Sequence, residues 1–202
     1  MVKSLKFLGY NVSTTMNITD VDDKTIRDSQ LAGETLKDFT EKYTKLFLDD
    51  LEKLSIAPAD NIVPVTTLIP EMVRMIQTML NRKNAYLAED GSIYFSVKSF
   101  SKYGKLANLD MKGMKESVRI DNDEYDKETA ADFVLWKGWK ESDGENFWEE
   151  TFKVDDKDVT IKGRPGWHIE CSACNMKYFG AQIDIHMGGE DLIFPDHQNE
   201  IA

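Results

Sequence analysis

The chain has 202 residues, 41% of them hydrophobic and 30% charged, the composition of a globular protein that can bury a core. Its formal net charge of −11 argues against a stand-alone nucleic-acid-binding protein, because neutralising phosphates needs a basic surface. No apolar run reaches the roughly eighteen residues that span a bilayer, and residues 1–10 do not form a secretory signal, so a cytoplasmic location is expected.

The amino-terminal part predicts helices on either side of one short strand. Residues 3–9 have helical spacing that ends at Gly9, and the β-branched residues of 12–18 are typical of a strand. The acidic residues of 20–23 suit the start of a helix. Beyond them, apolar residues recur at steps of three and four, which predicts one long amphipathic helix up to Leu54 (Ala32, Leu36, Phe39, Tyr43, Phe47, Leu51 and Leu54).

The middle of the chain predicts a loop, a helix and a hairpin, followed by less regular structure. Pro70 suits the first turn of a helix, and an apolar stripe continues from it to Leu80. Turn residues 89–92 separate two strand-like runs and predict a hairpin. The remaining predictions, in chain order, are irregular structure at 107–130, a helix or core-packed segment at 130–140, and a loop at 141–162 with an exposed hairpin or insertion at 153–158.

The carboxy-terminal part alternates between element types again. Residues 167–171 fit a strand end or a helix start, and 182–186 predict a strand that runs into a Gly-rich turn. Pro195 then suits a first helical turn. Strand, glycine turn and helix is the layout by which α/β folds place ligands at the carboxyl ends of strands, so a functional site is expected here.

This same part of the chain holds the residues with the most distinctive chemistry. Both cysteines and all three histidines fall within residues 168–197, among several carboxylates. Thiolate, imidazole and carboxylate are the ligands that zinc prefers. Cys171 and Cys174 form half of a zinc-ribbon pattern whose other half is absent, so a buried pair of inert cysteines is an equal alternative for these two residues alone.

The spacing of the last acidic residues favours metal binding. On a helix, Asp196 and Glu200 share one face, and His197 adjoins Glu200. The alternative is a solvated helix start stabilised by the helix dipole. His186 is expected to face a pocket, with a structural histidine as the alternative, and Trp167 either fills the core or forms a pocket wall.

Four blocks of sequence resemble those of a known family, in the same order along the chain. They are Met16-Asn-Ile-Thr-Asp-Val-Asp-Asp-Lys24, Asp132-Phe-Val-Leu-Trp-Lys137, Gly163-Arg-Pro-Gly-Trp-His-Ile-Glu-Cys-Ser172 and Phe194-Pro-Asp-His-Gln-Asn-Glu-Ile-Ala202. Through them the chain closely resembles cysteinyl-tRNA synthetase, a class I aminoacyl-tRNA synthetase, over its whole length, with one insertion near residues 150–160.

The resemblance implies an α/β fold, the Rossmann-like nucleotide-binding fold of class I synthetases, incomplete at both ends. Residues 1–58 would form its first part, 59–160 an inserted connective α+β region, and 161–202 its second part. It also implies that cysteine is activated with ATP and Mg²⁺ and transferred to tRNA(Cys). One zinc ion in the amino-acid pocket would separate cysteine from serine, because soft thiolate prefers zinc far more than an alcohol does.

The resemblance carries site residues over to this sequence, none of them as a catalytic residue. Cys171 and Glu200 match zinc ligands, and Asp196 stands where the family has a histidine ligand, so His197 or Cys174 is an alternative third ligand. The remaining positions are implied in two groups. The cysteine pocket would include Thr19, Trp167 and His186, and the nucleotide would lie near Gly188, Gly189 and Asp191.

The chain also departs from the family's pattern. The family's His-Ile-Gly-His and Lys-Met-Ser-Lys-Ser loops, which hold the transferring phosphates, are not in this sequence, so little or no aminoacylation by this polypeptide alone is expected. A sheet without its first strand would expose an edge, which makes self-association a further expectation. Two rival interpretations are the related cysteine ligase of mycothiol synthesis and a non-catalytic paralogue or binding module.

Overall fold

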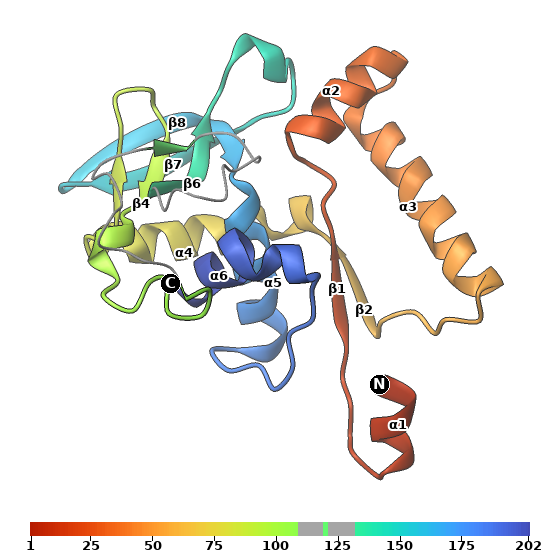
Figure 1. The fold of residues 1–202 in the computed structure, drawn as a ribbon. Coiled ribbons are helices and arrows are strands. Elements are labelled where there is room, and N and C mark those ends of the chain that lie inside the picture. Colours follow the sequence, from red (N-terminus) through yellow and green to blue (C-terminus); the bar gives the residue numbers. More distant parts are fainter. Residues whose placement is uncertain (109–118, 121–131) are drawn as a thin grey trace.

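The computed structural model describes residues 1–108, 119–120 and 132–202 (Figure 1). Its helices and strands are α1 Val2–Phe7, β1 Thr15–Ile18, α2 Asp23–Ala32, α3 Leu36–Lys53, β2 Asn61–Pro64, α4 Ile69–Asn81, β3 Ala85–Leu87, β4 Ile93–Phe95, β5 Arg119–Ile120, β6 Asp132–Gly138, β7 Trp148–Val154, β8 Lys157–Pro165, α5 Trp167–Phe179 and α6 Gln198–Ile201. Short helical turns are η1 Val65–Leu68, η2 Val97–Ser99, η4 Glu141–Asp143, η5 Glu190–Leu192 and η6 Ile193–His197. Most of the segment predicted to be irregular, 107–130, lies outside the described residues.

A parallel pair of strands occupies the centre of the molecule. β1 and β2 pair in register from Thr15 opposite Asn61 to Ile18 opposite Pro64. Helices α2 and α3 lie on one side of this pair and the larger sheet on the other (Figure 1). Because residues 61–64 pair with β1, the second strand of the pair comes from the segment assigned by sequence to the insertion; the division at residues 58 and 160 stays a prediction.

The long helix predicted up to Leu54 is wrong in one respect, because the structure divides it into α2 and α3. Gly33 ends α2 with a left-handed φ of 68°, a backbone conformation that favours glycine. Thr35 then caps α3 by accepting a hydrogen bond from the Asp38 amide at 3.1 Å. Apolar spacing continued through both helices, so periodicity alone did not reveal the break.

The second sheet has the order β3-β4-β6-β8-β7, with β5 beside β6, and its neighbours on that path are antiparallel. The predicted hairpins at 86–97 and 153–158 are confirmed as β3–β4 and as the turn between β7 and β8. In the segment 130–140, whose first two residues lie outside the described ones, residues 132–138 pack against the core, as one alternative predicted, but they form strand β6 and not a helix. The loop predicted at 141–162 is wrong, because most of it forms β7 and β8.

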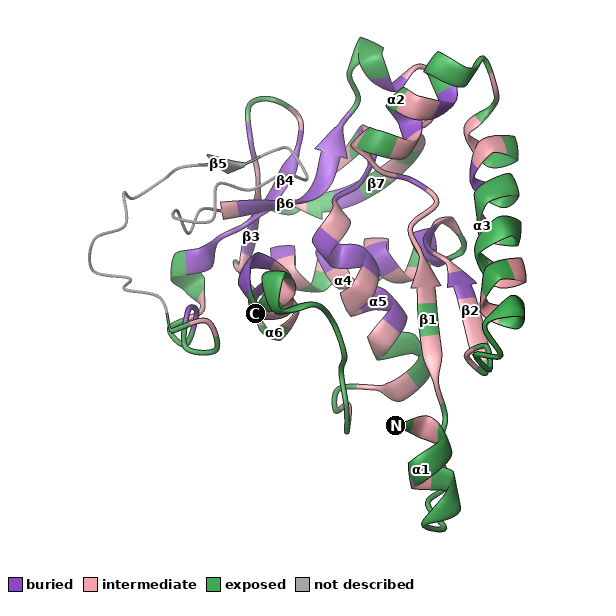
Figure 2. Ribbon diagram, turned by 45° about the vertical axis from the view of Figure 1, so that its right-hand side comes forward, coloured by how far each residue is buried: buried purple, intermediate pink, exposed green. Residues whose placement is uncertain are grey.

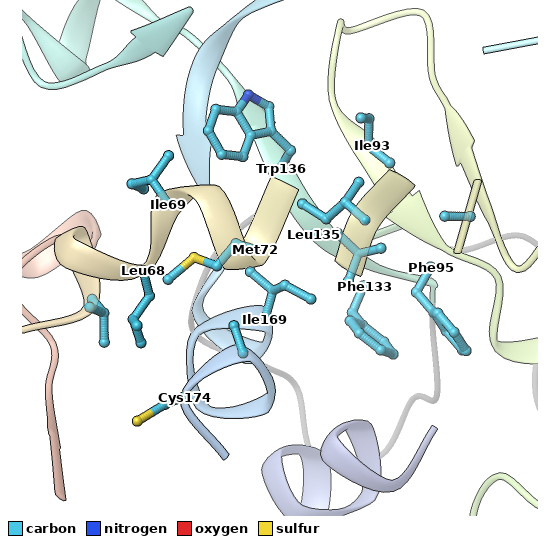
Figure 3. Packing of buried hydrophobic residues seen from close by; sticks show 14 of the residues in the cluster. Leu68, Ile69, Met72, Ile93, Phe95, Phe133, Leu135, Trp136, Ile169 and Cys174 are labelled. Atoms are coloured by element: carbon cyan, nitrogen blue, oxygen red, sulfur yellow. The ribbon is translucent and has the colours of Figure 1, made fainter. Parts of the chain in front are cut away.

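The hydrophobic core lies between this sheet, α4 and α5 (Figures 2 and 3). Trp136 of β6 and Met72 of α4 are fully buried, and Ile169 of α5 is 1% exposed. Cys174 belongs to the same cluster and is 2% exposed, so its thiol is a core side chain (Figure 3). The sheet and α4 therefore form the base on which α5 rests.

The carboxy-terminal segment differs from the prediction. Residues 182–186 form no strand in the structure; they belong to the connection between α5 and η5, all but Ile183 are exposed, and no described strand pairs with them. Pro195 lies in η6, where Phe194 has a non-helical backbone, and regular helix begins only at Gln198. Within the described ranges, no helix combines the length and the apolar content needed to cross a membrane.

Gly166 joins β8 to α5 and is expected to tolerate no side chain. Its amide donates to the Leu135 carbonyl at 2.9 Å, and a Cβ added there would lie 2.2 Å from the Val134 carbonyl oxygen. Because backbone atoms must then shift, Gly166→Ala is expected to lower the free energy of unfolding by about 1–3 kcal/mol in chemical denaturation. Gly189→Ala is the matched control, since its Cβ would meet only the movable Asp191 side chain. Equal stability of the two variants would contradict the expectation.

Candidate metal and amino-acid site

Helix α5 presents its first two turns to the site. Gly166 is the residue before the helix, with an extended backbone, and Trp167 begins the helix. Trp167 is partly buried, and its ring lies beside that of His168, with centroids 5.3 Å apart. One turn further, the Cys171 Sγ accepts a hydrogen bond from the Asn17 side chain of β1 at 3.5 Å. The helix therefore brings Cys171 against β1.

The short helix α6 brings a carboxylate and an imidazole to the same place. The Glu200 carboxylate lies near the Cys171 thiol, whose pKa its charge raises, and its Oε2 lies 2.9 Å from His186 Nε2. His197 Nδ1 lies 3.9 Å from the same oxygen. One ligand atom from each of His186, His197 and Glu200 lies within 4.8 Å of the others. Glu200 is thus the residue that touches every other donor of the cluster.

Asp196 lies next to this cluster, and the two oxygens of its carboxylate have different surroundings. Its Oδ1 lies 2.9 Å from Nδ1 of the buried His168. Its Oδ2 is buried without a hydrogen-bond partner among the described residues. A buried carboxylate oxygen that lacks a partner is costly, so this atom is available to coordinate a cation.

The pKa values of Cys171 and Glu200 are both raised, first by burial and then by neighbouring acidic groups. Burial raises the pKa of the Cys171 thiol well above its ordinary value, and the charges of Glu200, Glu170 and Asp196 raise it further. Burial also raises the pKa of Glu200, while His197 and the Cys171 thiol oppose that rise. Several acidic groups therefore share a site that water enters poorly, which is an environment that favours a bound cation.

A cavity of about 1320 Å³ adjoins the cluster. The predicted residues that line it are His186, Gly188 and Gly189, together with Glu200, and α4 and the second half of α5 form its opposite wall. Gly188 packs against His197, because a Cβ at this position would lie 2.6 Å from the His197 Nε2. Asp191 is exposed and lies beside Gly189.

Thr19 is not brought to this cavity. It lines a second cavity of about 490 Å³, together with Phe39, Tyr43 and Phe47 of α3. Trp167 lies at the start of α5 and does not line the large cavity either. Of the proposed zinc ligands, the structure places Glu200 in one donor group with His186 and His197, whereas Cys171 and Asp196 lie outside that group. Thr19 and Trp167 do not line the large cavity.

Two contacts of the site were missed by the sequence analysis. Asn17 donates to the Cys171 Sγ, and His168 contacts Asp196. Asn17 and His168 both lie in sequence blocks that resemble the known family, and this resemblance was the only sequence signal for them. Neither spacing nor residue type indicated which partner each would contact.

Comparison with known proteins agrees with this fold and these sequence blocks. Residues 1–202 match the family described as tRNA synthetases class I (C) catalytic domain. The Cysteine--tRNA ligase of Koribacter versatilis (strain Ellin345) is 48% identical over 198 residues, which are 98% of this chain and 38% of that protein. The protein of the same name from Leptospira interrogans serovar Lai is 48% identical over 200 residues, 99% of this chain and 40% of that protein.

A third relative, the Cysteine--tRNA ligase of Chlamydia trachomatis serovar D, is 47% identical over 199 residues, 98% of this chain and 40% of that protein. The chain thus spans about two fifths of the length of these curated relatives. The resemblance read from the four sequence blocks and the expected α/β class are confirmed by the family match. The chain belongs to the family of class I (C) tRNA synthetase catalytic domains.

Proposed function

We propose that this chain forms part of the catalytic domain of a cysteine–tRNA ligase and holds the pocket that selects cysteine by its thiol. The observation that carries the proposal is the group of Glu200, His186 and His197, with Cys171 near enough for the charge of Glu200 to raise its pKa. The whole reaction, in which cysteine is activated with ATP and Mg²⁺ and transferred to tRNA(Cys), is proposed by extension from the names of the relatives, each a Cysteine--tRNA ligase.

The residues present fit a zinc ion. The donors are one thiol, two imidazoles and carboxylates, which is zinc's preferred ligand chemistry. The orphaned Asp196 Oδ2 and the raised pKa values of Cys171 and Glu200 both indicate uncompensated acidic character. Cys171, Asp196 and Glu200 would hold the ion, with His197 or His186 as the imidazole ligand. When bound, zinc would stabilise a thiolate at neutral pH and so discriminate sulfur from oxygen.

The other residues would bind and orient in this proposal. His168 would hold the Asp196 carboxylate by its contact with Oδ1, and Asn17 would hold the Cys171 sulfur. Partners behind a ligand fix its direction and are usually important for affinity. Trp167, His186 and Thr19 are proposed to contact the amino acid, and Gly188, Gly189 and Asp191 to lie near the nucleotide.

Zinc is proposed because shape alone separates cysteine from serine poorly. The two differ by one atom, and a pocket that relies on packing discriminates weakly between such near-isosteres. Ligand softness separates them, since a thiol binds zinc as thiolate and an alcohol does not compete at neutral pH. A cytoplasmic location and self-association through the edge of β1, which pairs only with β2 among the described strands, are proposed with the same function.

Calorimetric titration with cysteine and with serine tests the proposal. Zinc-loaded chain is expected to bind cysteine at least about tenfold more tightly than serine, which corresponds to about 1.4 kcal/mol. The chain stripped of metal is expected to lose this preference. A matched control is Cys174→Ala, which removes the thiol that lies in the core and leaves Cys171 in place. Equal affinity of the zinc-loaded chain for both amino acids would refute the proposed selection.

A further inference from the structure

Helix α6 carries Glu200 but is too short to hold its own position. It has four residues, Gln198–Ile201, and follows η6. Forming a first helical turn is unfavourable in isolation, so a helix of one turn depends on contacts from elsewhere. The position of Glu200 must therefore be fixed by whatever binds the remaining residues of α6.

Beside the packing of α6 against α5 and η6, two hydrogen bonds to α6 come from a turn far away in the sequence, residues 103–106. The Tyr103 hydroxyl donates a hydrogen bond to Asn199 Oδ1, and the Leu106 amide donates to Gln198 Oε1 at 3.1 Å. All three side chains involved are buried, with Tyr103 4%, Gln198 1% and Asn199 5% exposed. Two adjacent amide side chains of α6 are thus bound to one turn that lies in the segment assigned by sequence to the insertion.

Side chains in and just before α6 point in two directions. Gln198 and Asn199 bond to the 103–106 turn, whereas His197 and Glu200, three positions apart and so on a shared face, reach the donor cluster. A rotation or shift of this short helix would move both sets together. The turn at 103–106 is therefore coupled geometrically to the placement of Glu200.

The Tyr103–Asn199 contact cannot be replaced easily by another one. Asn199 Nδ2 is buried without a hydrogen-bond partner among the described residues, so the bond from Tyr103 is the one the Asn199 side chain makes there. Burial raises the pKa of the Tyr103 phenol well above its ordinary value, which keeps the hydroxyl protonated as a donor. Loss of the Tyr103 hydroxyl would leave the buried Asn199 amide without a hydrogen-bond partner among the described residues.

We propose that Tyr103 is a positioning residue that acts through Asn199 to hold α6, so that Glu200 and His197 meet His186 in the ligand cluster. The proposal deepens the proposed function, on which it rests for the identity of the metal. It gives the inserted region a role in the site: this region supplies the contact that orients a ligand carried by the other part of the chain. Tyr103 itself need not touch the metal or the amino acid.

Tyr103→Phe removes only the hydroxyl and tests this directly. Zinc affinity, measured by competition with a chromophoric chelator, is expected to fall about tenfold, the lower end of the effect of losing a partner behind a metal ligand. Tyr94→Phe is the matched control. Its hydroxyl donates to Asp90 at 2.8 Å from a ring that is 1% exposed, in strand β4 of the second sheet. A purely structural loss would affect both variants alike, so only a fall confined to Tyr103→Phe supports the proposal.

A double-mutant cycle identifies the route of the effect. Asn199→Ala removes the acceptor from the other side, and if Tyr103 acts through Asn199 the double variant should lose no more zinc affinity than the larger single loss. Additive losses would overturn this route. If Tyr103→Phe does not fold, the zinc affinity of Asn199→Ala is compared with that of the wild type instead.

Amide hydrogen exchange on the peptide that contains residues 198–201 gives a readout that needs no metal. If the Tyr103–Asn199 hydrogen bond holds α6 in place, this peptide exchanges faster in Tyr103→Phe than in Tyr94→Phe. Equal exchange in the two variants overturns the inference. Zinc affinity and hydrogen exchange together distinguish failure of the proposed function from failure of the inference about Tyr103. A wild-type chain that binds no zinc refutes the proposed function while the exchange result still decides the role of Tyr103. A wild-type chain that binds zinc with unchanged affinity in Tyr103→Phe refutes the inference alone.

Discussion

Glu200→Gln is expected to abolish stable zinc binding. The Glu200 carboxylate lies 2.9 Å from His186 Nε2 and 3.9 Å from His197 Nδ1, so it is the group that both imidazoles share, and its charge raises the pKa of Cys171. The amide keeps the size of the side chain but removes its charge and its ability to bind a metal as an anion. The expected loss of affinity exceeds the roughly 100-fold upper range for a partner behind a ligand.

Metal analysis after exhaustive dialysis measures this loss, and chelator competition measures the affinity that remains. Glu190→Gln is the matched control, because Glu190 lines the same cavity as an exposed carboxylate and belongs to no group of potential ligands among the described residues. It is expected to retain wild-type zinc. If Glu200→Gln retains zinc as well as Glu190→Gln does, the proposed ligand set is wrong.

Zinc binding is also expected to weaken as the pH falls. Cys171 and Glu200 both have raised pKa values in the metal-free chain, so each is protonated at a higher pH than an ordinary thiol or carboxyl group. Zinc must displace these protons to bind, and acid therefore competes with it. Chelator competition repeated at several pH values measures this effect. Glu200→Gln removes one of the two groups that acid protonates.

The sequence predicted those parts of the fold that follow from local signals. The β3–β4 hairpin was found from its turn residues, and the helical spacing of α2 and α3 was found without the break at Gly33. Strand β7 was missed because only one side of it is buried: Phe152 is fully buried, whereas the charged residues around it face solvent. Its partner β8 is charged for the same reason, so both resembled a loop.

Residues 182–186 illustrate the opposite error. Alternating apolar residues predicted a strand, but a strand forms only where a neighbour accepts its hydrogen bonds, and no described strand does so. In the site, the pairing of Cys171 with Glu200 followed from resemblance. The partners Asn17, His168 and Tyr103 did not, because each contact joins segments that are distant in sequence and depends on packing.

Arg164→Met is expected to be among the most destabilising single substitutions. The Arg164 side chain is 3% exposed, and its guanidinium contacts Asp23 of α2 and, through Nε at 3.4 Å, Asp143 of η4. Lys137, the register partner of Arg164 across β6 and β8, also contacts Asp23, at 2.6 Å. These residues join α2 to the second sheet. Removing the buried cation would leave Asp143, which is 9% exposed, without its charge partner.

The expected cost is about 3 kcal/mol in chemical denaturation, the lower end of the range for breaking a buried ion pair. The lower end applies because Asp23 is 41% exposed and keeps Lys137, so water and the lysine compensate part of the loss. Arg74→Met is the matched control: its side chain is 68% exposed and pairs with Glu71, and its cost should stay below about 1 kcal/mol.

A second substitution distinguishes the two contributions to the loss of stability: the unpaired charge of Asp143 and the lost packing of the Arg164 side chain. If uncompensated charge on Asp143 is the main cost, adding Asp143→Asn to Arg164→Met should restore part of the stability, even though Asp143 also accepts a hydrogen bond from the Lys140 amide. If the double variant is no more stable than Arg164→Met, the loss comes from the packing of the arginine and not from its charge. Arg164 lies two residues before Gly166, the residue that precedes α5, so the network adjoins the start of the helix that brings Cys171 against β1.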